Sequence, residues 1–69
     1  MIDDNMLMSR IGKSGFKLAY IAEKSGLSYA GLRKKLNGET EFKASEIVAI
    51  SSLLNLTKAE RDHIFLSNT

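Results

Sequence analysis

Apolar residues recur every three or four positions along much of this chain, which is the spacing of one face of an α-helix. The two clearest stripes are Leu18, Ile21 and Ala22, and Ile47, Ile50 and Leu54. The chain contains no proline, so no residue lacks the backbone N–H that a continuous helix needs. These observations predict an all-α fold of five short helices without a strand.

Glycines and polar capping residues mark where the predicted helices begin and end. Gly26 is expected to end the second helix, because glycine adopts the left-handed conformation without steric cost. Ser28 is expected to cap the third helix by accepting a hydrogen bond from an unpaired N–H, and Thr57 with Glu60 forms a capping box for the fifth. The predicted helices span about 5–14, 17–25, 28–37, 44–54 and 57–66.

The length of 69 residues allows one domain, residues 1–69, with a thin hydrophobic core. The apolar fraction of 43% and the charged fraction of 26% are typical of a globular protein. No cysteine is available for a disulfide, so stability must come from helix packing, a partner chain or both. Phe42 is expected to anchor the loop at 39–43 in the core.

Localisation is predicted from what the sequence lacks. No apolar run approaches the roughly 18 residues that a membrane span needs. Asp3 and Asp4 make the start of the chain acidic, which is unlike a secretory signal. A chain without cysteine also fits a reducing compartment. We therefore expect a cytoplasmic protein without a membrane partner.

Basic residues concentrate in the middle of the chain. Residues 10–38 carry seven Lys or Arg against one Glu, a net charge of +6, whereas 1–9 and 39–69 each carry −2. A polyanion is the natural partner for such a basic block. A solvated helical surface that happens to be basic explains the charge alone equally well.

Residues for catalysis or metal binding are not arranged as either chemistry needs. His63 and Asp62 are adjacent, so their side chains would point apart on a helix and could not form a relay. A lone histidine does not make a zinc site. Gly12-Lys13-Ser14 resembles the end of a phosphate-binding loop but lacks the earlier glycine and the preceding strand. We predict neither an enzyme nor a cofactor, metal or small-molecule substrate.

The segment at about 17–37 has the pattern of a helix-turn-helix. A small residue stands where two helices would cross, a glycine allows the turn, a leucine fills the corner and a serine starts the next helix. These residues are Ala22, Gly26, Leu27 and Ser28, with Ile21 and Leu32 as the paired core positions on either side.

This pattern resembles the DNA-binding domain of the phage Cro/CI repressor family, also called the XRE type, over about 5–66. The resemblance implies a five-helix, lambda-repressor-like domain whose third helix enters the major groove. It further implies a sequence-specific transcriptional regulator that binds a double-stranded operator as a homodimer. Leu18, Lys35, Glu39 and Glu41 depart from the family pattern, and the two glutamates put negative charge in the loop after the third helix.

The outward side of the third helix supplies the candidate base-reading residues. At about 100° per residue, Lys34 points directly away from a core that contains Leu32 and Leu36. Basic side chains can donate to guanine O6 and N7, and an apolar group can contact a thymine methyl. The predicted base-reading residues are Tyr29, Ala30, Gly31, Arg33 and Lys34. The resemblance implies phosphate contacts at the start of the second helix, and the predicted phosphate contacts are Lys17, Leu18, Ser28, Lys35 and Asn37.

The final helix, at about 57–66, contains the apolar run Ile64, Phe65 and Leu66. Three consecutive residues cannot all face inward. Either two lie in the core and one is exposed, or the run makes a homodimer contact, which is the interpretation we favour. The apolar run and the acidic loop also suit an alternative function, in which the helix-turn-helix is a scaffold for an antitoxin or anti-repressor that binds protein.

Overall fold

The computed structural model describes residues 4–66, and this range is entirely helical and turn, without a strand. The five helices are α1 (Asp4–Ser14), α2 (Leu18–Lys24), α3 (Tyr29–Leu36), α4 (Ala44–Leu53) and α5 (Lys58–Phe65). The predicted all-α fold of five helices is confirmed, and the helix ends agree with the predicted ones within one or two residues.

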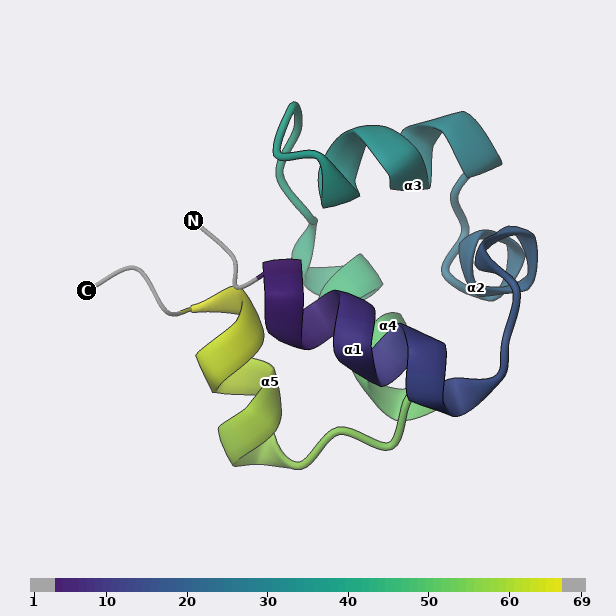
Figure 1. The fold of residues 1–69 in the computed structure, drawn as a ribbon. Coiled ribbons are helices and arrows are strands. Elements are labelled where there is room, and N and C mark those ends of the chain that lie inside the picture. Colours follow the sequence, from purple (N-terminus) through teal and green to yellow (C-terminus); the bar gives the residue numbers. More distant parts are fainter. Residues whose placement is uncertain (1–3, 67–69) are drawn as a thin grey trace.

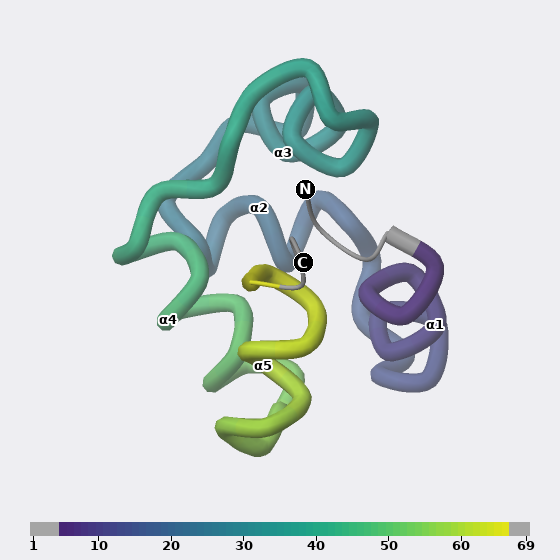
Figure 2. The backbone as a smooth tube through the Cα atoms, turned by 90° about the vertical axis from the view of Figure 1, so that its left-hand side faces the viewer, coloured from purple at the N-terminus to yellow at the C-terminus, as the bar shows by residue number. Residues whose placement is uncertain are grey.

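The helices surround a single core (Figure 1). In that view α3 lies across the top, α2 is seen end-on at the right, and α1 runs in front of α4. Helix α2 packs against both α3 and α4, whereas α5 packs against α1 and α4. Figure 2 shows the same arrangement from the side, with α3 above α2 and with α4 and α1 on opposite flanks.

Every helix contributes to the core. Five side chains are essentially inaccessible to solvent: Leu7, Ile21, Leu32, Ile50 and Ile64. They come one from each helix, which is why the short helices depend on one another: a helix this short is marginal on its own in water. The stripes predicted on the second, third and fourth helices all contribute to this core.

The turn between α2 and α3 is fixed by backbone hydrogen bonds. Gly26 has a φ of 74°, which only glycine adopts without strain. The Leu27 N–H donates to the Ala22 carbonyl at 2.8 Å, and the Gly26 N–H donates to the Glu23 carbonyl at 3.2 Å. This is the Schellman pattern of helix termination. The predicted stop at Gly26 is confirmed, and it sets the angle at which α3 leaves α2.

Caps and long-range contacts hold the other ends. The Thr57–Glu60 capping box is present, with hydrogen bonds of 2.8 and 3.1 Å in the two directions. The Thr57 N–H, opposed by partial desolvation and helped by Arg10, holds the pKa of Glu60 below its ordinary value. Arg10 in α1 also pairs with Glu60, which joins α1 to α5. Phe42 packs edge-on against Phe65 with ring centroids 5.3 Å apart, so its predicted anchoring role is confirmed.

Candidate nucleic-acid interface

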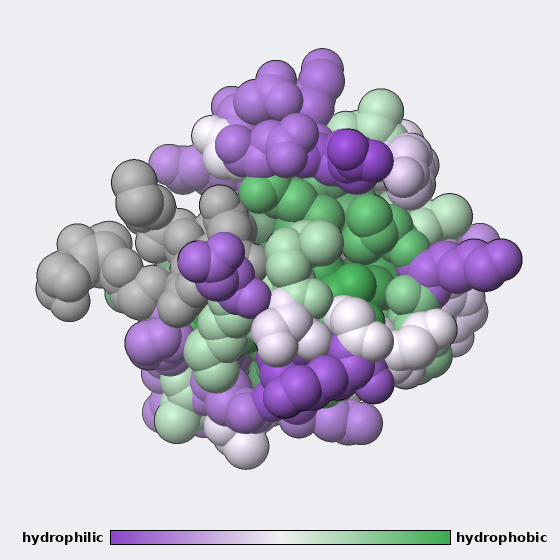
Figure 3. All heavy atoms as spheres, viewed as in Figure 1, coloured by the Kyte–Doolittle hydropathy of each residue, from purple (hydrophilic) through white to green (hydrophobic). Residues whose placement is uncertain are grey.

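The outward face of α3 consists of exposed, mostly polar residues. Leu32 and Leu36 are buried, which turns the opposite side of the helix to solvent. That side carries Tyr29, Ala30, Arg33, Lys34 and Asn37, all exposed. Figure 3 shows hydrophilic side chains gathered over α3, with apolar side chains beneath them. The helical geometry therefore brings four of the five predicted base-reading residues to one face.

Ser28 holds the start of this helix in place. Its hydroxyl oxygen accepts a hydrogen bond from the Gly31 N–H at 2.9 Å, so the predicted cap is confirmed. Gly31, the fifth predicted base-reading residue, is half-buried here. A Cβ atom at this position would lie 3.0 Å from the Ser28 hydroxyl oxygen, so the missing side chain leaves room for the cap. The hydroxyl proton of Ser28 remains able to donate outward.

Arg33 is held by an aromatic neighbour one helical turn earlier. Its guanidinium donates to the Tyr29 hydroxyl at 3.1 Å and lies 5.8 Å from the centre of the Tyr29 ring. These contacts combine a hydrogen bond with a cation–π interaction at the i, i+4 spacing. They restrict the guanidinium without neutralising its charge, so Arg33 presents a fixed cation on the outward face.

Lys34 lies at the middle of the outward face. Its side chain is exposed. Within residues 4–66 neither Lys34 nor Arg33 forms an ion pair. Within residues 4–66 neither Glu39 nor Glu41, in the loop after α3, takes part in an ion pair. Two positive charges therefore stand exposed on this face, without an ion-pair partner in the described part of the chain.

Lys35 has a different environment, and the prediction that it contacts phosphate needs correction. Its ammonium group donates to the Glu41 backbone carbonyl at 2.7 Å and lies 3.2 Å from a carboxylate oxygen of Glu46. It also lies 6.0 Å from the centre of the Phe42 ring. The side chain is only 11% exposed. Lys35 thus fastens α3 to α4 and the loop between them, because its position on the helix turns it inward.

Glu46 completes this α3–α4 seam, which we define as Lys35, Glu46 and the Glu41 carbonyl. A Glu46 carboxylate oxygen accepts from the Lys43 backbone N–H at 2.8 Å and so caps α4. Burial raises the pKa of Glu46, but the Lys43 N–H and the Lys35 ammonium together outweigh burial and hold this pKa below its ordinary value. Glu46 is therefore ionised at neutral pH and serves two elements at once.

The remaining predicted phosphate contacts lie at helix ends. Lys17 is the exposed N-cap residue of α2, and Asn37 is the exposed C-cap residue of α3. Leu18 is half-buried and packs against the core, so its side chain is turned away from the surface. Only its backbone N–H, one of the first in α2 and without an intrahelical acceptor, offers a donor there.

The apolar run on α5 divides between core and surface. Ile64 is fully buried and Phe65 is 7% exposed, so both belong to the core of this chain. Leu66 is 61% exposed. This corrects the prediction that all three residues form a dimer contact: of the three, Leu66 alone offers apolar surface to a partner.

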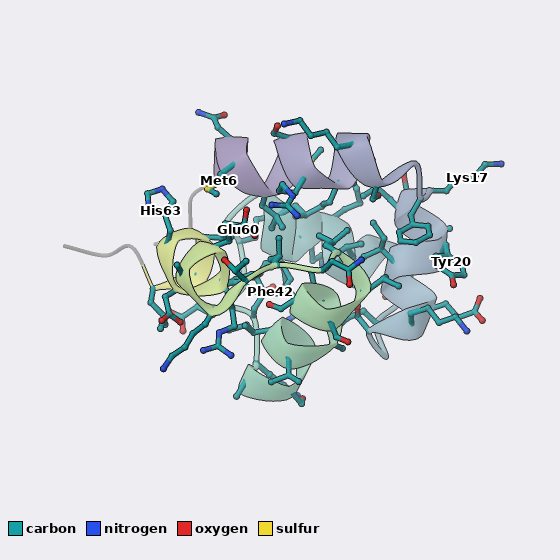
Figure 4. All side chains as sticks on the ribbon, turned by 90° about the horizontal axis from the view of Figure 1, so that it is seen from below. Met6, Lys17, Tyr20, Phe42, Glu60 and His63 are labelled. Carbon is teal, nitrogen blue, oxygen red and sulfur yellow. The ribbon has the colours of Figure 1, made fainter. Side chains whose placement is uncertain are left out.

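Two exposed aromatic residues escaped the sequence reasoning. Phe16 precedes α2 and Tyr20 lies in its first turn, with ring centroids 5.0 Å apart. The Lys24 ammonium lies 5.5 Å from the centre of the Tyr20 ring. Figure 4 shows Lys17 and Tyr20 pointing away from the core at the end of the molecule opposite His63. The stripe of Leu18 and Ile21 already placed Tyr20 off the buried face, which was the available signal.

The described part of the chain, residues 4–66, contains no group of three or more His, Cys, Asp or Glu that could hold a metal ion. Within the same range no helix combines the length and the apolar character that crossing a membrane requires.

No protein-family model, curated protein or solved structure matches this chain. What the outward face of α3 can bind therefore follows from its own geometry and charge.

Proposed function

We propose that this chain is a sequence-specific double-stranded DNA-binding regulator of the helix-turn-helix type. In this proposal α2 and α3 form the motif within a lambda-repressor-like domain, and α3 enters the major groove. The major groove admits an α-helix and displays a distinct pattern of donors and acceptors for each base pair.

The observation that carries the proposal is the pair of cations on the outward face of α3. Arg33 and Lys34 are exposed and have no ion-pair partner within residues 4–66. Lys and Arg are the side chains that most often read guanine. Small Ala30 leaves room for the helix to approach base edges.

The first residues of α2 and α3 offer groups that can contact the phosphates of the DNA backbone. The exposed Lys17 stands beside the first N–H groups of α2, and the Ser28 hydroxyl stands at the start of α3. N–H groups, hydroxyls and lysines are common phosphate contacts, and such contacts set the position of a protein on duplex DNA. We assign phosphate contacts to Lys17, Ser28, Asn37 and the backbone N–H of Leu18.

A homodimer fits this mode of binding. Two copies related by a two-fold axis would place their α3 helices about one DNA turn apart on a palindromic operator. Leu66, exposed at the end of α5, is the apolar residue of the predicted run that is free to join such a contact.

Selection from randomised duplex DNA, carried out with the purified chain at 50 and 200 mM salt, tests the proposal. We expect an enriched palindromic sequence at both salt concentrations. Lys34→Ala should lose the enrichment at one base pair of each half-site, whereas Lys58→Ala, which removes an exposed lysine of α5, should retain it. A pool that stays random, or one that Lys34→Ala enriches as wild type does, contradicts the proposal.

A protein-binding role is the second candidate, in which the helices are a scaffold for an antitoxin or an anti-repressor. The exposed acidic loop with Glu39 and Glu41, together with exposed Leu66, favours it. This candidate predicts a protein complex that resists salt and a chain that does not retain duplex DNA even at 50 mM salt. Retention of DNA that weakens steeply with salt decides for the first proposal.

A further inference from the structure

Phe16 and Tyr20 form an exposed aromatic pair at the start of α2. The two side chains are 37% and 41% exposed, and their rings lie 5.0 Å apart at an angle of 37°. A chain of 69 residues has little apolar material for its core, yet these two rings stay outside it. Aromatic side chains contribute much of the binding energy when a partner covers them.

The pair borders an open depression, which we call the aromatic hollow. Its lining residues are Gly15, Phe16, Lys17, Ala19, Tyr20 and Glu23. Ala19 is exposed and small, so the surface between the two rings and Glu23 is left unfilled. The hollow thus has room for one bulky apolar side chain, with two aromatic rings to pack against it.

One lysine, Lys17, lines the hollow, and a second, Lys24, stands next to it over the Tyr20 ring. Lys17 is the N-cap residue of α2 and Lys24 is its last residue, so they are seven positions apart, or about 10 Å along the helix axis. The Lys24 ammonium lies 5.5 Å from the centre of the Tyr20 ring. Glu23 is the single carboxylate among the lining residues. Charge complementarity therefore favours a partner with carboxylates on either side of an apolar residue.

The ring contacts distinguish a protein from a single-stranded nucleic acid. Bases bind such surfaces by stacking on the face of an aromatic ring. The Tyr20 ring already has Phe16 against it and Lys24 above it, so stacking a base there would displace one of them. A branched apolar side chain needs only the hollow beside the rings.

We propose that the aromatic hollow docks an acidic, apolar segment of a partner protein. A leucine-sized side chain seats over Ala19, beside the Phe16 and Tyr20 rings, and two carboxylates about 10 Å apart pair with Lys17 and Lys24. On a helical partner this spacing corresponds to acidic residues at i and i+7 with the apolar residue between them. The site uses none of the residues on the outward face of α3 and shares only Lys17 with the proposed phosphate contacts, so it goes beyond DNA binding.

The test uses synthetic helical peptides as probes against the full 69-residue chain. The first peptide carries leucine between glutamates at i and i+7. The second has the glutamates replaced by lysines, and the third has the glutamates moved to i+1 and i+5. Binding is followed by fluorescence anisotropy and by amide chemical shifts, which locate the contact without any substitution in the protein.

We expect the first peptide alone to bind and to shift the amides of residues 16–24. Tyr20→Ala and Ala19→Gln, which removes a ring or fills the hollow, should each weaken binding at least about tenfold. Lys24→Gln should weaken it about threefold. The matched controls are Lys58→Gln, for an exposed lysine, and Val48→Ala, for an exposed apolar residue, and both should bind as wild type.

Several results would overturn the proposal. If the lysine peptide or the peptide with shifted glutamates bound as tightly as the first peptide, the pairing of glutamates with Lys17 and Lys24 would be contradicted. Shifts confined to α3 would show an acidic peptide imitating DNA instead. Amides of residues 16–24 that move with protein concentration alone would assign the surface to a second copy, and shifts there with oligothymidylate would assign it to nucleic acid. No shift in this segment at millimolar peptide also contradicts it.

Discussion

The outward face of α3 and the α3–α4 seam use the same kind of residue for opposite purposes. Lys34 and Lys35 are neighbours in the sequence, yet one ammonium stands in solvent and the other is held by Glu46 and the Glu41 carbonyl. A step of about 100° around the helix makes this difference. A count of basic residues therefore overstates a binding surface, because the helix assigns part of the charge to its own fold.

The largest effect that tests this comparison is expected from Glu46→Ala. The substitution leaves Lys35 without its carboxylate partner and removes the hydrogen bond that caps α4 through Lys43. We expect the free energy of unfolding to fall by about 2–3 kcal/mol, from the combined loss of a largely buried ion pair and a cap. Chemical denaturation measures it. Glu39→Ala, in the exposed loop, should lower the free energy of unfolding by less than about 0.5 kcal/mol. Equal losses in the two variants would contradict a stabilising role of the α3–α4 seam.

Lys34→Ala and Lys35→Ala are a matched pair of variants that tests the difference between the outward face of α3 and the α3–α4 seam. Lys34→Ala should weaken binding to the selected operator by about 1–3 kcal/mol and relax the preference at one base pair, with stability unchanged. Lys35→Ala should lower stability and leave the base preference intact. Anisotropy titrations on the operator and on single-base variants measure both. A Lys35→Ala protein with relaxed preference would place that ammonium in the interface after all.

Acid should weaken the seam before it affects the outward face. Because the pKa of Glu46 is held below its ordinary value of 4.5, the unfolded chain binds this proton more tightly than the folded chain. The stabilisation is complete above the unfolded pKa and is lost as pH falls through the lowered folded one. Thermal unfolding between pH 6 and 2.5 should show this loss below about pH 4.5, and Glu46→Gln should flatten it. An unchanged profile in Glu46→Gln would exclude this linkage.

The pKa of Glu60 is lowered as well, through the Thr57 N–H and then Arg10, so it contributes to the same acid transition. Glu60→Gln should therefore remove a second share of the pH dependence. Glu39→Gln is the control and should keep the wild-type profile.

The smallest effect is expected at Lys17, which we assign to phosphate and not to bases. Lys17→Ala should weaken binding to operator and random DNA alike and reduce the slope of log K against log salt by roughly one unit. Titrations at four salt concentrations give the slope, with Lys58→Ala as the control. A slope equal to that of wild type would remove Lys17 from the phosphate contacts.

The helix ends were predictable because they are fixed by hydrogen bonds between residues that are close in the sequence. Gly26, Ser28 and the Thr57–Glu60 box act through neighbours within five residues, so the sequence alone placed these helix ends correctly. Asn55 ends α4 with a φ of 56°, a glycine-like role that went unnoticed because asparagine adopts this conformation less often.

Side-chain fates that depend on other helices were not predictable in this way. The step around the helix gives Lys34 and Lys35 different directions, but the sequence alone does not show that Lys35 meets Glu46, whose carboxylate lies 3.2 Å from its ammonium group. The sequence left open whether two residues of the run at 64–66 lie in the core or all three make a dimer contact, because the burial of Ile64 and Phe65 depends on how α5 meets α1 and α4. The stripe of Leu18 and Ile21 places Tyr20 off the buried face, but it gives no signal for Phe16, which precedes α2, or for the contact between the two rings.

The residues that position α3, including those of the Schellman turn and the serine cap, are different from the residues that α3 exposes to solvent. Gly26, Ser28 and Leu32 set the direction and depth of the helix, whereas Ala30 and Lys34 have no packing duty toward the other helices. Mutational freedom is thereby concentrated at the exposed positions: natural selection can exchange their side chains, and under the proposed function the preferred DNA sequence with them, while the scaffold and its folding stay the same.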